Sequence, residues 1–279
     1  MYKHLTGLDH VVLRVADLDR AADDFARMGF TLSPRGVHTL GTENRCLMFG
    51  FDYLELLWVP PDVIAPFYAE VPSDDERMTA IAVKTTDAAD LHAAWTRAGL
   101  APTPALEFSR PVDVGDGNTE DARFRTMALP AERTPGGRVF ACQHLTPGLV
   151  WRRGLSRHKN QVTGINKVVI AAEDPATAAL EWARVFDIAR HPIPGGIAIN
   201  TGAAPIVILR PDAIDRQMPG LVRPPIGREP AFAAIYLSTG ELRTAASVLH
   251  AGDFRPVALP DGSLGLGADV AHGIALVFK

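Results

Sequence analysis

The sequence has only two cysteines, Cys46 and Cys142, among 279 residues. Two thiols so far apart have neither the paired spacing of a zinc site nor the framework of a small disulfide-rich secreted domain. We therefore expect both to be buried free thiols in a reducing compartment, and we interpret the chain as cytoplasmic.

The chain also lacks an excess of positive charge. It has 28 Lys and Arg against 32 Asp and Glu, which gives a formal net charge of -4. A protein that binds nucleic acid needs a basic surface for the phosphates, so we expect no nucleic-acid partner. No apolar run reaches the roughly 20 residues that span a bilayer, and the N-terminus "MYKHLTGLDH" does not read as a signal peptide, so we expect no membrane partner.

Turn-forming residues, in contrast, are plentiful. The 24 glycines and 22 prolines fit many short strands separated by turns. The length is comfortable for two domains.

Residues 8–16 are β-branched or aliphatic for the most part and predict a strand. Alternation places His10 on the same face as Leu8, opposite the face of Val11 and Leu13. A histidine within an otherwise apolar strand is the first candidate for function.

A helix and further strands complete this unit. Asp17 is a suitable N-cap for a helix that Gly29 ends, and the segments "FTLSP", "RCLMFGF" and "DYLELLWV" predict three more strands. Similar units start at residues 78, 164 and 232. The first and third copies are the most alike and share Gly7, Val11, Val12, Asp17, Ala21, Ala22, Ala26 and Arg27 at corresponding positions.

The four units predict two domains. Units one and two form residues 1–150, units three and four form residues 163–279, and the basic segment "WRRGLSRHKNQV" (151–162) is the expected linker. A sheet with helices on one face must bury its other face, and pairing two units would give a curved sheet with a cleft.

Three motifs carry a family resemblance: "LDHVVLRVADLD", "GVHTLGTENRCLMFGFDYLELL" and "CQHLTPGLVW". With them the chain resembles the vicinal oxygen chelate superfamily and, within it, the glyoxalase-like group of tandem two-domain bacterial proteins. The resemblance implies an α+β fold of four βαβββ modules, paired into two glyoxalase/dihydroxybiphenyl-dioxygenase-like domains with curved mixed sheets. It leaves the chemistry open, because the superfamily includes lyases, isomerases, epimerases, dioxygenases and sequestering proteins.

A carboxylate on the last strand of the first unit is the second candidate. In "DYLELLWV", Glu55 and Tyr53 share one face and Leu54 and Leu56 share the other. The leucines are expected to pack on the helices, so that Glu55 points into the cleft.

If the modules pair as in the superfamily, His10, Glu55 and His144 meet in the cleft, with Gln143 as an alternative to His144. Two imidazoles and one carboxylate suit a divalent cation such as Fe, Mn, Ni or Zn. Such a metal would stabilise an enediolate, or bind oxygen if it is iron. Ala80 stands where the fullest family pattern has a fourth ligand.

The stretch "GVHTLGTENRC" adds His38, Thr42 and Asn44, which the resemblance places in the substrate pocket, near Tyr53. His38 is a candidate third ligand, general base or hydrogen-bond donor. An ordinary turn explains the same residues equally well.

Two more residues, His158 and Asn160, resemble a family His-x-Asn element and are predicted to bind substrate, with a solvated basic linker as the alternative. The polar residues 110–118 are interpreted as a long loop, a possible lid.

The third unit has Lys167 in place of His10 and the apolar run "APIVIL" in place of the strand with Glu55. The second domain thus keeps the scaffold without the ligands. The leading hypothesis is a metal-dependent lyase or isomerase that acts on a small oxygenated substrate, with a homodimer left open. The alternatives are a metal-free protein that binds or sequesters a small molecule, and a ring-cleaving dioxygenase, which is disfavoured because that arrangement has its ligands in the second half.

Overall fold

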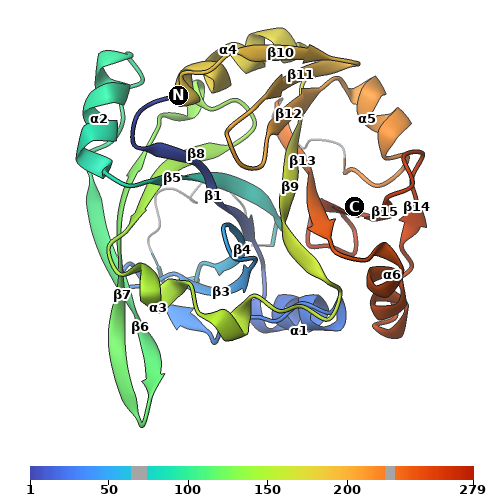
Figure 1. The fold of residues 1–279 in the computed structure, drawn as a ribbon, viewed down its shortest axis with the longest axis horizontal. Helices are drawn as coiled ribbons and strands as arrows, with labels where there is room; N and C mark the ends of the chain where they lie inside the picture. Colours follow the sequence, from blue (N-terminus) through green and yellow to red (C-terminus); the bar gives the residue numbers. More distant parts are fainter. Residues whose placement is uncertain (64–73, 224–229) are drawn as a thin grey trace.

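The computed structural model describes residues 1–63, 74–223 and 230–279. They form two eight-stranded mixed sheets with the same topology (Figure 1). The strand order is β2-β3-β4-β1-β5-β8-β7-β6 in the first sheet and β10-β11-β12-β9-β13-β16-β15-β14 in the second. Each sheet contains two βαβββ modules whose first strands pair antiparallel at the centre. The predicted α+β fold of paired modules is confirmed.

The strands of the first sheet are β1 (Leu5–Arg14), β2 (Gly36–Val37), β3 (Glu43–Met48), β4 (Tyr53–Trp58), β5 (Arg77–Thr85), β6 (Leu106–Gly115), β7 (Asn118–Ala128) and β8 (Arg138–His144). Those of the second are β9 (Val162–Ala171), β10 (Arg190–Ile193), β11 (Gly196–Ile199), β12 (Ile206–Leu209), β13 (Ala231–Thr239), β14 (Val257–Ala258), β15 (Leu264–Leu266) and β16 (Ala275–Phe278). The helices are α1 (Leu18–Arg27), α2 (Ala88–Arg97), α3 (Pro147–Val150), α4 (Pro175–Phe186), α5 (Pro211–Gln217) and α6 (Leu242–Ala251).

Three of the module helices begin at an aspartate that caps them. The carboxylates of Asp17, Asp87 and Asp174 each accept two backbone N–H groups of the first turn. Gly29 and Gly99 follow the ends of α1 and α2 with positive φ, which glycine adopts without strain. These ends are where the sequence predicts them.

One hydrophobic core joins the two sheets. It contains Phe25 of α1, Trp95 of α2, Trp182 of α4 and Leu249 of α6, together with the helix-facing residues of both sheets. The Trp95 indole donates a hydrogen bond to the carbonyl oxygen of Val185 (3.0 Å), which lies in the other half of the chain. The helices therefore pack across the boundary between the two sheets. Among the described residues, no helix is long and apolar enough to span a membrane.

The opposite faces of the two sheets differ. On the second sheet, Ile214 of α5 and the following Met218 and Leu221 pack against strand residues such as Val169 and Tyr236. An apolar layer therefore covers this side of the second sheet. The first sheet keeps a cavity on the corresponding side.

The first sheet curls around that cavity because its two edges meet. The backbone N–H of Thr39, just after β2, donates to the carbonyl oxygen of Ser109 in β6 (2.9 Å). The backbone N–H of Ser109 donates in turn to the Thr39 hydroxyl (3.2 Å). These two hydrogen bonds link the first and last strands of the sheet order.

The polar residues 110–118 form a hairpin rather than the expected loop. β6 and β7 pair along their length, and Asp116 and Gly117 at the tip have positive φ. The loop prediction is wrong because the outward residues of this hairpin are polar and conceal the inward apolar residues Val112 and Phe124.

Candidate functional site

A β-bulge in β1 places two polar residues on the cavity side. The register of β1 against β5 shifts between Leu8 and His10, so that Asp9 is the extra residue and Ala82 lies opposite His10. Leu8 packs into the helix-side core, whereas both Asp9 and His10 turn the other way. Alternation places Leu8 beside His10, and this prediction is wrong because of the bulge.

Asp9 is fully buried and holds two imidazoles. Its Oδ2 accepts a hydrogen bond from His10 Nδ1 and another from His144 Nε2, both at 2.8 Å. Lys84 Nζ lies 3.3 Å from its Oδ1. Burial alone would raise the pKa of the Asp9 carboxyl, but the two imidazoles outweigh it and hold that pKa well below the usual range. Asp9 is therefore an ionised carboxylate that orients His10 and His144.

His10 meets Glu55 at the wall of the cavity. Because Nδ1 of His10 is bound to Asp9, its Nε2 faces Glu55, with 3.6 Å between Nε2 and Oε2. The ring of Tyr53 stacks on the imidazole with a centroid distance of 4.3 Å. Two ligand atoms that bind one divalent cation of the predicted kind, each about 2.1 Å from it, lie at most about 4.2 Å apart. The His10–Glu55 pair meets this condition, and a carboxylate behind the histidine is typical of metal-bound imidazoles.

The cluster predicted from "GVHTLGTENRC" also lies in the cavity. The Asn44 amide nitrogen donates to Glu55 Oε1 (2.5 Å) and lies 3.2 Å from His38 Nε2. His38 Nδ1 lies 2.8 Å from the Thr42 hydroxyl. Since the amide nitrogen only donates, we assign the proton of His38 to Nδ1. Burial lowers the pKa of His38, which favours the neutral imidazole.

His144 and Gln143, the alternative predicted ligands, lie on opposite faces of β8. Gln143 lies on the helix side, where its Oε1 accepts the backbone N–H of Ala88 (3.1 Å) and its Nε2 donates to the carbonyl oxygen of Thr86 (3.0 Å). His144 lies on the side of His10 and Asp9. Among the described residues no ion pair joins His144 directly to Glu55, so that the contact between the predicted ligands runs through Asp9.

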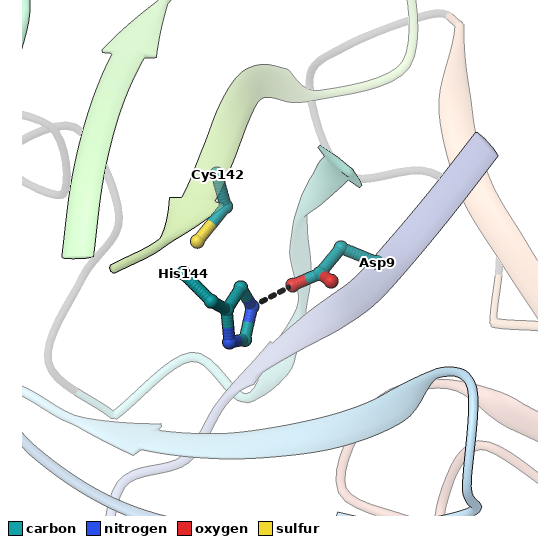
Figure 2. Close-up of side chains that lie close together, drawn as sticks. All are labelled: Asp9, Cys142 and His144. Carbon is teal, nitrogen blue, oxygen red and sulfur yellow. Dashed lines mark hydrogen bonds and ion pairs between the residues drawn. The ribbon is translucent and has the colours of Figure 1, made fainter. Parts of the chain in front are cut away.

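A second set of possible ligands surrounds His144. Donor atoms of Asp9, Cys142 and His144 all lie within 4.8 Å of one another (Figure 2). Burial raises the pKa of the Cys142 thiol well above its usual range, so that a thiolate there needs a cation beside it. The ring of Trp151, from the segment predicted as a linker, stacks on His144 with a centroid distance of 5.7 Å.

The cavity has a volume of about 270 Å³ and a mostly apolar wall. Its polar lining includes all the predicted first-sheet residues other than His144, and Arg110 and Arg138 as well. The apolar lining includes Leu57, Phe108, Phe124 and Phe140. The two cysteines are buried free thiols, as expected, and both line the cavity.

His158 and Asn160 are not brought to the cavity. His158 accepts the backbone N–H of Thr31 at Nδ1 and donates from Nε2 to the carbonyl oxygen of Met48, both at 2.9 Å. The Asn160 amide donates to the carbonyl oxygen of Met28 (2.9 Å). Both side chains are buried and fasten the first module to the segment before β9.

Asp9 and Arg110 are among the site residues that sequence reasoning missed. The only signal for Asp9 is a carboxylate on a strand face that is otherwise apolar, which is incompatible with regular alternation. Arg110 was assigned to the loop that is in fact β6.

A model of the glyoxalase-like domain family matches residues 8–186. The chain belongs to this family. Among solved structures, a hypothetical protein from Staphylococcus aureus is similar, with a TM-score of 0.69, 12% identity and coverage of 98% of both chains. A triple mutant of 4-hydroxymandelate synthase from Streptomyces coelicolor matches with a TM-score of 0.58 and 12% identity, over 99% of this glyoxalase-like chain and 92% of that one.

A third solved structure is a fusion of a xylose isomerase-like TIM barrel with 4-hydroxyphenylpyruvate dioxygenase. It matches with a TM-score of 0.56 and 15% identity, over 98% of this chain and 49% of the fusion protein. At such low identity these neighbours show the fold alone, whereas the matching family model confirms the predicted glyoxalase-like membership. A search of curated protein sequences found no match.

Proposed function

We propose that this glyoxalase-like protein is a metal-dependent enzyme that acts on a small oxygenated molecule by proton transfer, as a lyase or isomerase. The supporting observation is the contact of 3.6 Å between His10 Nε2 and Glu55 Oε2 at the cavity wall, with Asp9 fixing the imidazole from behind. A carboxylate–histidine pair of this kind is a common arrangement around a bound metal.

The donors suit a divalent cation of the Fe, Mn, Ni or Zn type. His10 and Glu55 would hold it, with His144 as the predicted third ligand; Asp9, Cys142 and His144 are the competing set. When bound, the cation would polarise two adjacent oxygens of a substrate as a Lewis acid.

The residues around the pair have distinct tasks in this proposal. His38, neutral because of its burial, would accept a substrate proton at Nε2 once the Asn44 amide moves aside. Burial raises the pKa of Tyr53 well above its usual range, so that its hydroxyl stays protonated and serves as a donor to substrate oxygen. The apolar wall excludes water, which strengthens these interactions.

A metal-free binding or sequestering protein is the second candidate. It is favoured by the mostly apolar wall and by Ala80, an alanine at the position where the fullest family pattern has a fourth ligand. A ring-cleaving dioxygenase is the third candidate. It is disfavoured because the predicted ligands lie in the first sheet, whereas that class of enzyme has them in the second half of the chain.

Metal analysis separates these candidates. We expect protein purified without chelators to contain about one divalent metal ion per chain, and His10→Ala and Glu55→Gln to lose it. His191→Ala, which removes an exposed histidine of β10, is the matched control and should keep the metal. Metal-free wild-type protein that still binds a hydrophobic dye would support the sequestering protein instead. Protein that carries metal would then be screened, with several metals, against α-oxo-aldehyde conjugates, 2-oxo acids and catechols.

Cobalt substitution distinguishes the two ligand sets. A thiolate-to-cobalt absorption band that Cys142→Ser removes would indicate the set of Asp9, Cys142 and His144. A cobalt protein without this band, and with spectra unchanged by Cys142→Ser, would indicate His10 and Glu55.

A further inference from the structure

We propose that Arg110 is the anion-binding residue of the cavity and that the substrate is a small carboxylate with an aromatic or aliphatic body. The inference rests on the function proposed above, since it names the substrate class of the same cavity. The juxtaposition that carries it is a buried, unpaired guanidinium within an apolar wall.

Arg110 lies inside the curled sheet. On β6 it points inward with Phe108 and Val112, it is 8% exposed, and it lines the cavity. In the part of the chain that the structure describes, its guanidinium forms no hydrogen bond and no ion pair within 4.0 Å. A guanidinium cannot lose its charge in a protein and carries five N–H donors. Its N–H donors face the cavity and have no acceptor among the described residues, so an acceptor group of a bound ligand can pair with them there.

The surroundings make room for this side chain. At Gly36 of β2, a Cβ atom would lie 3.0 Å from Arg110 Cδ and 2.5 Å from Asn44 Oδ1. The hydrogen bonds between Thr39 and Ser109 hold the neighbouring backbone of β6 against this segment. Glycine at position 36 thus leaves the space that Arg110 and Asn44 occupy.

The charges nearby indicate how negative the ligand is. The carboxylate of Glu55 also lines the cavity, and the ionised Asp9 lies behind His10. Burial favours the neutral form of His38, and Arg138 is a second cation among the described residues of the wall. A monovalent carboxylate can pair with the guanidinium through two parallel hydrogen bonds, whereas a phosphate dianion would meet stronger repulsion from Glu55.

The apolar wall indicates the body of the ligand. Phe108 and Phe124 stack with a centroid distance of 5.2 Å, and Phe140 and Leu57 line the same space. Such side chains favour an aromatic or branched aliphatic group beside the charged end.

Calorimetric binding to chelator-treated protein tests the proposal without requiring a metal or turnover. The probes are phenylacetate, its neutral analogue phenylacetamide, and phenyl phosphate. We expect the wild-type protein to bind phenylacetate at least 10-fold more tightly than the other two. Arg110→Gln should abolish the preference over phenylacetamide, and Arg110→Lys should retain part of it. Arg123→Gln, an exposed arginine on the same hairpin, is the control and should retain all of it.

Equal binding of acid and amide by the wild type, binding of neither, or an undiminished preference in Arg110→Gln would overturn the proposal. Tighter binding of phenyl phosphate would overturn the choice of a carboxylate. Because the comparison of phenylacetate with phenylacetamide is also made on the wild-type protein, the proposal is tested even if a variant misfolds. The metal content of Arg110→Gln should equal that of the wild type, so loss of the anion site and loss of the metal site give different results.

Discussion

Asp9 is the residue on which the polar side of the cavity depends. One of its oxygens accepts hydrogen bonds from both His10 and His144, and it is completely buried. It therefore fixes which nitrogen of His10 faces Glu55. In metal sites, partners of this kind are worth about 10–100-fold in affinity.

We accordingly expect Asp9→Asn to weaken metal binding about 10–100-fold, because the amide carries no charge and can present a donor to the imidazoles. Competition with a chelating dye measures the affinity. Asp212→Asn, at an exposed carboxylate of α5, should leave it unchanged. A folded Asp9→Asn protein with wild-type affinity would show that the carboxylate has no role in the metal site.

The two thiols give a second prediction at this scale. Burial raises the pKa of Cys46 to about 12, and it raises that of Cys142 well above the usual range. Since only the thiolate reacts, we expect neither cysteine of the native protein to be modified by a disulfide reagent within minutes at pH 8, and both to react in denaturant. Rapid modification of one equivalent in the folded state would contradict the burial of that side chain.

At the scale of elements, β8 divides its residues between two tasks. Cys142 and His144 face the cavity, whereas Gln143 satisfies backbone groups at the start of α2. The strand thus links the polar site to the helix layer.

Gln143→Leu removes both hydrogen bonds of that side chain without touching the cavity. We expect it to lower the free energy of unfolding by about 1–3 kcal/mol, as measured by urea denaturation, and to leave the metal content unchanged. His144→Leu, in contrast, should lose the metal. A Gln143→Leu protein that loses metal at wild-type stability would overturn this division.

The sequence predicts the regular elements and fails where geometry departs from regularity. Alternation is sufficient for Glu55, because β4 is regular and its Leu54 and Leu56 face the helices. It fails at Asp9, since a bulge shifts the pattern by one residue and nothing local marks it. It also misplaces His158, because the backbone groups that this side chain binds lie more than a hundred residues away.

At the scale of the whole molecule, buried polar contacts tie the two halves together. Asp52, after β3, accepts the backbone N–H of Ile165 in β9 (3.1 Å). His272, before β16, lies 3.0 Å from Glu76 and 3.2 Å from Asp24 of α1. These contacts lie beside the common core of the helix layers.

The burial of Asp52 makes stability depend on pH. Burial raises the pKa of Asp52 from its usual 3.8 to about 6. The folded state therefore binds this proton more tightly than the unfolded state, and stability falls as the pH rises from about 4 to about 6. Asp52→Asn keeps an oxygen for the Ile165 N–H and removes the charge. We expect it to be more stable than the wild type by up to about 3 kcal/mol at pH 8, with the difference vanishing near pH 4. Urea unfolding at both pH values measures this, and a variant that is less stable at pH 8 would contradict it.

Because one core serves both sheets, the chain cannot be dissected at its midpoint into two independent pieces. Either fragment alone would expose to water the tryptophans and phenylalanines that the other fragment covers. We expect the fragments 1–154 and 155–279 to be insoluble when produced singly and to reassemble into a ligand-competent pair when produced together, which co-purification from one cell would show. A repeat that began as a duplication would then have become an obligatory partnership, in which the second half supports the half that carries the candidate site.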